Sequence, residues 1–160
     1  SGVPKGSFYY YFRSKNDFGL AVIDAYAEGY RDRLDATLGD HRRTPLERIR
    51  LYLDTAAGDV AESDYSKGCL IGNLGQELAA QNDAFRERLN DVFANWERRF
   101  RDCIAEGQQQ GEVSSEVDAT EAASLLLSGW QGALLRSKLT RSSEPLTHFR
   151  NLLFSRVLQP

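Results

Sequence analysis

The feature that most constrains the fold is an apolar residue at every third or fourth position, a rhythm that runs through almost the whole chain. Apolar residues at this spacing lie on one face of an α-helix. Only four of the 160 residues are prolines, so few positions interrupt a helix. No segment alternates apolar and polar residues in the way that is typical of a strand. The pattern predicts an all-α protein.

Capping signals and breaks divide this pattern into seven predicted helices. Ser14 and Asp17 have the spacing of a capping box, and Asp118 and Glu121 have it again. Thr44 precedes a proline, as an N-cap residue does when proline occupies the first helical position. The predicted helices cover about residues 4–11, 14–39, 44–60, 69–79, 82–109, 118–139 and 143–157.

Each predicted helix has a stripe of residues that we expect to face the core. In the helix predicted at 14–39 the stripe is Phe18, Val22, Ala25, Tyr26, Tyr30 and Leu34. In the helix at 82–109, whose end we assign to Gly107 and Gly111, it is Phe85, Leu89, Val92, Phe93, Trp96, Phe100, Cys103 and Ile104. In the helix at 143–157 it is Leu146, Phe149, Leu152, Leu153 and Val157.

The helix predicted at 118–139 is apolar around more than one face, since Leu125, Leu126, Trp130 and Leu134 do not share a single side. A helix with so wide an apolar surface must bury its second side. Its small residues, among them Gly132, permit a close approach of helices. We therefore expect the last two helices to form a two-fold four-helix bundle in a homodimer. The alternative is a core helix buried entirely within one chain.

Composition limits the class of protein. At 41% hydrophobic residues the chain can bury one core, and no apolar run approaches the ~20 residues of a membrane-spanning helix. Two distant cysteines, Cys69 and Cys103, are too few for a disulfide scaffold and favour the reducing cytoplasm. The chain has no methionine. Ser1 is therefore not a translation start, and we expect residues upstream of it to be missing.

Positive charge is concentrated at the N-terminus. Residues 1–15 contain three basic residues and no carboxylate, whereas the remainder has 17 basic and 23 acidic residues. The same segment has three consecutive tyrosines. An acidic protein with one cationic, tyrosine-rich tip is suited to bind a polyanion at that tip. Taken alone, the segment also fits an aromatic helix that packs on its neighbours.

Residues 3–15, VPKGSFYYYFRSK, resemble the recognition helix and the start of the following helix in TetR-family transcriptional regulators. The resemblance implies a repressor with a helix-turn-helix head that binds a double-stranded DNA operator, and a body that binds a small-molecule effector. Residues 1–15 would be the C-terminal remnant of that head, with two helices preceding it, and 16–160 the connecting helix, ligand-binding and dimerisation domain. The implied DNA-binding residues are Lys5, Gly6, Ser7, Tyr9, Tyr10 and Lys15.

Two positions of this segment need separate interpretation. The family often has histidine where this chain has Tyr11, which fits either packing or a phosphate contact. Phe8 and Phe12 lie four residues apart, and we expect them to pack in the core.

Two motifs in the body resemble a subgroup of that family, the one with the N-ethylmaleimide reductase repressor and acrylate-responsive regulators. They are SKGCL at 66–70, followed by ELA at 77–79, and ALLRSKLTRSSEPL at 133–146. The resemblance implies that Cys69 senses reactive electrophiles or oxidants and that Lys138 is its partner. Cys69 also follows Lys67 and Gly68 at a predicted helix start, where free N–H groups and a cation favour the thiolate. The alternative is an inert buried cysteine.

The other candidates are less specific. Cys103 lies on an aromatic stripe and is expected to be core. His41 and His148 have no metal spacing with the cysteines, and no catalytic set or phosphate-binding loop stands out, so we expect no metal, cofactor or enzymatic activity. Polar and aromatic residues that could line a ligand pocket are Tyr65, Asn73, Trp96, Trp130 and Gln131.

Two rival functions remain open at this point. One is a repressor of the same family with a reversible, non-covalent apolar ligand. The other is a helical ligand-binding dimer that does not bind DNA.

Overall fold

The computed structural model describes residues 9–160, and these residues form helices and no strand. The helices are α2 (Lys15–Thr37), α3 (Pro45–Glu62), α4 (Leu70–Leu78), α5 (Asp83–Gln109), α6 (Ala119–Thr140) and α7 (Glu144–Leu152), and a π-helical turn, η1, covers Leu153–Val157. The all-α prediction is confirmed. The six predicted helices that lie wholly within residues 9–160 are present, with ends that differ by a few residues at most.

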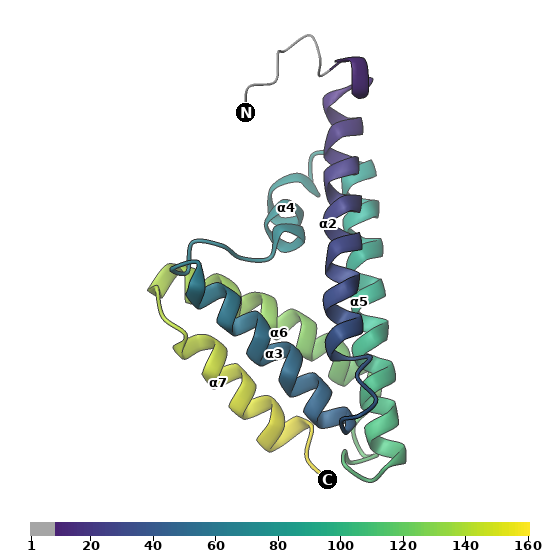
Figure 1. Ribbon diagram of the computed structural model, residues 1–160, viewed down its shortest axis with the longest axis vertical. Helices are drawn as coiled ribbons and strands as arrows, with labels where there is room; N and C mark the ends of the chain where they lie inside the picture. Colours follow the sequence, from purple (N-terminus) through teal and green to yellow (C-terminus); the bar gives the residue numbers. More distant parts are fainter. Residues whose placement is uncertain (1–8) are drawn as a thin grey trace.

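Two long helices, α2 and α5, run side by side along the molecule (Figure 1). Helix α3 packs on both of them, α6 packs on α5, and α7 packs on α6. The short helix α4 packs on α5 and lies beside the upper half of α2 in this view. The N-terminal end of α2 projects beyond the rest of the body, with a helical turn at Tyr9–Tyr11 on its tip.

The helix starts follow the capping residues. Ser14 accepts a hydrogen bond from the backbone N–H of Asp17 at 3.0 Å, while the carboxylate of Asp17 accepts from Nε of Arg13. The reciprocal capping box forms instead at Thr44 and Glu47, directly before and within the first turn of α3. A glutamate reaches the N-cap N–H more easily than the shorter aspartate does.

The stripe predicted for α5 is confirmed as a face that packs in the core. It is joined by Gly107, which is interior to the helix and does not end it: a Cβ there would lie 3.0 Å from Val113 and 3.3 Å from Pro45. Gly111, at a φ of +76°, follows the end of α5 in the left-handed region that favours glycine.

Two other stripes need correction. On α2, Phe18 and Ala25 are exposed, and Ile23, which was not in the predicted stripe, is fully buried together with Leu34. The upper part of α2 extends past the body, so only its side toward α5 is covered. On α7, Leu152 is 61% exposed, because Leu153 occupies the position that faces the core.

The apolar surface of α6 is mostly internal. Leu126, Trp130 and Leu134 are buried within the chain. For these three residues the structure agrees with the alternative interpretation, a core helix buried within one chain. An exposed apolar strip nevertheless remains, with Gly132 open to space within it. The strip consists of Leu125, Leu135 and Leu139 of α6 and Leu152 of α7.

The lower end of α2 is fixed by a buried arginine of α3. Arg48 is 1% exposed, and its Nη1 donates to the carbonyl oxygen of Leu38 at 2.9 Å and contacts Nδ1 of His41 at 3.1 Å. Its Nη2 lies 2.5 Å from a carboxylate oxygen of Glu106 on α5. One guanidinium thereby joins the end of α2, the helix α3 and the end of α5.

Candidate functional site: a cysteine-lined cleft

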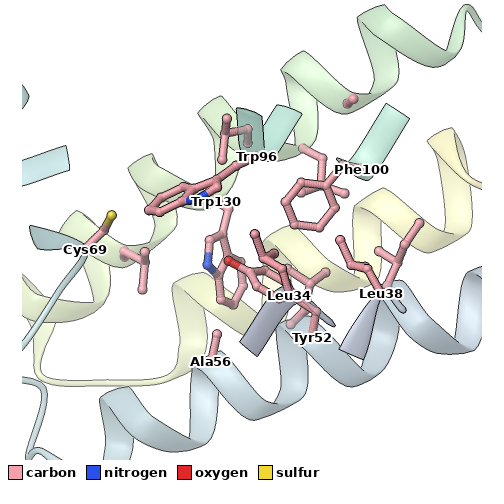
Figure 2. Packing of buried hydrophobic residues seen from close by; sticks show 14 of the residues in the cluster. Leu34, Leu38, Tyr52, Ala56, Cys69, Trp96, Phe100 and Trp130 are labelled. Atoms are coloured by element: carbon pink, nitrogen blue, oxygen red, sulfur yellow. The ribbon is translucent and has the colours of Figure 1, made fainter. Parts of the chain in front are cut away.

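A cleft of about 960 Å³ separates α2 and α3 from the start of α4 and from α6. Its walls combine aromatic and aliphatic residues with a comparable number of polar and charged ones. The residues with the most informative chemistry are Tyr26, Tyr30, Arg33, Asp59, Lys67, Cys69, Asn73 and Trp130. Figure 2 shows Cys69 at one edge of the labelled core residues.

Cys69 is the N-cap residue of α4. Its Sγ accepts a hydrogen bond from the backbone N–H of Gly72 at 3.4 Å, so the thiol faces the first turn of the helix. The side chain of Gln131 on α6 and the backbone of Ile71 also form hydrogen bonds with the sulfur. The prediction that Cys69 lies at a helix start is confirmed.

The predicted direction of the pKa shift at Cys69 is wrong. Burial raises the pKa of the thiol above its usual value and outweighs the opposing hydrogen bonds from Gly72, Gln131 and Ile71. The side chain is 9% exposed. The sequence shows that a helix begins here, but not how far the neighbouring helices cover the sulfur.

The floor of the cleft is a stack of aromatic rings. Tyr30 stacks on Trp96 with ring centroids 4.3 Å apart, and its hydroxyl is hydrogen-bonded to that of Tyr52. Burial raises the pKa of Tyr30 to about 12 and that of Tyr52 well above its usual value, so both phenols stay neutral. Tyr30, which lines the cleft, can therefore hydrogen-bond to a ligand but does not charge the cleft.

An ion pair spans the cleft wall between α2 and α3. Nη2 of Arg33 binds a carboxylate oxygen of Asp59, and the guanidinium lies 5.5 Å from the ring centre of Tyr30. The hydroxyl of Tyr26, one turn above Tyr30, is hydrogen-bonded to the backbone of Leu70 at the start of α4. The cleft therefore contains direct links from α2 to both α3 and α4.

A second cavity, of about 610 Å³, adjoins the first on the side of α6. Cys69, Asn73 and Leu134 line both cavities, so the thiol lies at the boundary between them. Lys138 and Gln131 line the second cavity. The structure thus brings Cys69 and Lys138 to one cavity, as the two sequence motifs suggested.

Cys103 has different surroundings. It is buried on the core side of α5, and its Sγ donates to the carbonyl oxygen of Pro45 at 3.4 Å. Burial raises the pKa of this thiol to about 11. The prediction that Cys103 packs in the core is confirmed.

The tip of the molecule exposes its tyrosines. Tyr9 and Tyr11 are exposed and Tyr10 is 84% exposed, with the rings of Tyr10 and Tyr11 in edge-to-face contact. Lys15 is exposed as the first residue of α2. Lys5, Gly6, Ser7 and Phe8 lie outside the described residues, and Phe12 packs edge-to-face against Phe18.

Residues 45–153 match the family described as "Tetracyclin repressor-like, C-terminal domain". The chain is 44% identical over 147 residues to the transcriptional regulator AcuR of Cereibacter sphaeroides, which covers 92% of the chain and 67% of AcuR. The chain belongs to the TetR family.

Solved TetR-family structures agree with this assignment. The crystal structure of regulatory protein TetR from Rhodobacter sphaeroides has a TM-score of 0.92 at 42% identity, over 97% of this chain and 82% of that one. The reduced form of NemR from Escherichia coli, a protein named as an HTH-type transcriptional repressor, has a TM-score of 0.85 at 26% identity, over 99% of this chain and 82% of that one. The protein is a TetR-family transcriptional regulator.

Within this TetR-family body, three of the five predicted pocket residues line the cavities and two do not. Asn73 and Trp130 line the larger cleft, and Asn73 and Gln131 line the smaller cavity. Trp96 is buried and supports Tyr30 from behind. Tyr65 lies in the α3–α4 loop at a φ of +56°, packs against the core and is in the lining of neither cavity.

Sequence reasoning missed the polar residues of the cleft wall. Tyr26 and Tyr30 were assigned only to a core-facing stripe, and Arg33 and Asp59 received no role. The two tyrosines could have been identified, because two hydroxyl groups one turn apart on a core-facing stripe need hydrogen-bond partners. The sequence pattern does not indicate the Arg33–Asp59 ion pair, because its two residues lie on separate helices.

No group of three or more histidine, cysteine or acidic side chains in residues 9–160 has an arrangement that could hold a metal ion. No helix among these residues is both long and apolar enough to span a membrane.

Proposed function

We propose that the protein is a homodimeric, DNA-binding repressor of the cytoplasm, not an enzyme, which a reactive electrophile or oxidant releases from its operator by acting at Cys69. The observation that carries this proposal is the first turn of α4. There the thiol of Cys69 accepts from the backbone N–H of Gly72, the hydroxyl of Tyr26 on α2 is hydrogen-bonded to the backbone of Leu70, and the side chain of Gln131 on α6 is hydrogen-bonded to the sulfur.

The chemistry proposed for the thiol is conjugate addition. The thiol releases its proton to solvent, and the thiolate forms an S–C bond with the β-carbon of an α,β-unsaturated carbonyl compound. The π electrons of the C=C bond move to the carbonyl oxygen, and the enolate then takes a proton from water. The size of the cleft and its mixed aromatic, aliphatic and polar lining suit a small electrophile that carries a polar carbonyl group.

An adduct at Cys69 has a physical route to the DNA-binding end. The adduct adds volume at the first turn of α4, which Tyr26 joins to α2 through the Leu70 backbone. Helix α2 leads directly to the exposed Tyr9, Tyr10 and Lys15. The effector shifts the protein toward release only if the modified protein favours a position of α2 that fits the operator less well.

DNA binding and dimerisation rest on the exposed surfaces. The tyrosine hydroxyls of the tip and Lys15, beside the positive end of α2, suit contacts with phosphate oxygens. We assign Lys5, Gly6 and Ser7 to the same interface. The exposed strip of Leu125, Leu135, Leu139 and Leu152 supports a two-fold interface through α6 and α7, with the open side of Gly132 permitting close approach.

The similarity to NemR supports a thiol-based mechanism, because the solved NemR structure is named as a reduced form. One observation favours the rival instead. The raised pKa of Cys69 reduces the thiolate fraction at neutral pH, which fits a reversible, non-covalent ligand in the same cleft. In that case Cys69 only lines the pocket.

Operator release by the two cysteine variants distinguishes these functions. The regulator with a complete helix-turn-helix head is bound to a labelled operator and treated with an electrophile, and release is followed by fluorescence anisotropy. We expect Cys69→Ser to bind DNA normally but to resist release, while the matched control Cys103→Ser responds like the parent protein. Normal release of Cys69→Ser would exclude the covalent mechanism.

A further inference from the structure

Gln131 occupies an unusual position relative to the sensing thiol. It lies on α6, beside Gly132 of the exposed strip, yet its half-buried side chain reaches α4 and forms a hydrogen bond with the Cys69 sulfur. The same side chain lines the second cavity together with Cys69 and Lys138. It is therefore a direct link between the thiol and the helix of the proposed dimer face.

Gly72 provides the space that Gln131 needs. A Cβ at position 72 would lie 2.5 Å from Oε1 of Gln131 and 3.4 Å from its Cδ, so no larger residue leaves the amide in place. The backbone N–H of the same glycine donates to the Cys69 sulfur at 3.4 Å. One glycine thus supplies a donor for the sulfur and admits a second donor from α6.

We propose that Gln131 is the positioning residue of the sensor: its amide holds the Cys69 sulfur against the first turn of α4, and modification of the sulfur releases that amide and with it the link to α6. This inference rests on the proposed function for its regulatory meaning, whereas its chemical part concerns the thiol alone. The amide N–H donates to the sulfur, and a thiolate is a much stronger acceptor than a thioether. Alkylation therefore removes the acceptor that holds the amide and adds volume where the amide lies.

The strength of this contact predicts a measurable change in the thiol. Removing one hydrogen-bond donor to a buried thiolate raises the pKa of the thiol by about one unit. A rise of one unit lowers the thiolate fraction about tenfold at neutral pH. Each remaining thiolate becomes about threefold more nucleophilic, because nucleophilicity rises with pKa. The net result is alkylation about threefold to fourfold slower at pH 7, with no loss of rate on the high-pH plateau.

The test is the pH–rate profile of Cys69 alkylation by iodoacetamide in this chain, measured by peptide mass spectrometry. In that reaction the S–C bond forms, iodide leaves and the thiol proton goes to solvent. Gln131→Leu removes the amide, Gln131→Glu replaces its donor by a carboxylate, and Gly72→Ala displaces the side chain but keeps the backbone N–H. We expect all three to raise the profile's midpoint by about one unit. Gln76→Leu is the matched control, because Gln76 lines the same cavity but donates to the Gly72 carbonyl.

Three results would overturn the proposal. One is a midpoint within about 0.3 unit of the parent protein in Gln131→Leu and Gly72→Ala. Another is an equal shift in Gln76→Leu, which would assign the effect to the cavity in general. The third is a lowered plateau at an unchanged midpoint, which would mean that Gln131 controls access and not ionisation. None of these results depends on operator release, so the positioning role and the proposed function can fail separately.

Discussion

The Arg48–Glu106 pair provides a quantitative test of what holds α2 in place. In Glu106→Gln the buried guanidinium of Arg48 loses the carboxylate that contacts it but keeps the carbonyl of Leu38 and the more distant charge of Glu112. Removing one partner of a fully buried pair costs about 3–5 kcal/mol. The Glu106 side chain is 35% exposed, so solvent screens the interaction and reduces this figure. We expect the free energy of unfolding to fall by about 1.5–2 kcal/mol.

Urea denaturation followed by circular dichroism measures this change, with Glu87→Gln as the matched control. Glu87 lies on the same helix, is 70% exposed and contacts Arg86 at 3.6 Å, so its replacement should cost less than about 0.5 kcal/mol. The hydrogen bond from Arg48 lowers the pKa of Glu106 below its usual 4.5. The pair therefore contributes fully above pH 4.5, and its contribution is lost as the pH falls through the folded-state pKa.

The difference between the parent protein and Glu106→Gln should accordingly shrink as the pH is lowered from 6 to 3. A loss below about 0.5 kcal/mol at pH 7, or a difference that grows in acid, would refute the assignment of Arg48 and Glu106 as the group that fixes the end of α2.

Three further predictions concern the head, the core and the dimer. In the regulator with a complete head, Lys15→Ala should weaken all operators alike and reduce the slope of log affinity against log salt by about one; an unchanged slope excludes a phosphate contact. Gly129→Ala would place a methyl group against the ring of Phe149 and should lower the free energy of unfolding by about 1–3 kcal/mol, whereas Gly58→Ala, with no atom within 4 Å of the added carbon, should raise it by up to ~1 kcal/mol. Leu125→Glu should convert the dimer into a folded monomer in sedimentation velocity at micromolar concentration, and a dimer that persists moves the interface elsewhere.

The helices could be predicted because their determinants are local. Thr44 with Pro45 begins α3, and Gly111 follows the end of α5, whatever packs around them. Burial around each helix was less predictable, because it depends on what lies opposite. Leu152 and Leu153 are adjacent and equally apolar, and their burial depends on how α7 and η1 pack: Leu152 ends α7 exposed, whereas Leu153 begins η1 buried.

At the site too, local features could be predicted from the sequence, whereas features that depend on distant parts of the chain could not. The motif around Cys69 correctly indicated a thiol at a helix start, and the motif around Lys138 indicated a residue near it. The direction of the Cys69 pKa shift was missed because burial by α2 and α6 is a long-range property. The Arg33–Asp59 pair and the Tyr26–Leu70 hydrogen bond join helices far apart in the sequence, so no spacing could reveal them.

The most direct test of the central claim compares adduct formation and operator release in the same sample. The regulator with a complete head is titrated with an electrophile, and the fraction of Cys69 modified is measured by peptide mass spectrometry beside the fraction of operator released. The account predicts that release rises in proportion to the Cys69 adduct and persists after the free compound is removed by gel filtration. Release that precedes the adduct, or that reverses on gel filtration, would contradict covalent sensing and leave the cleft as a reversible ligand site.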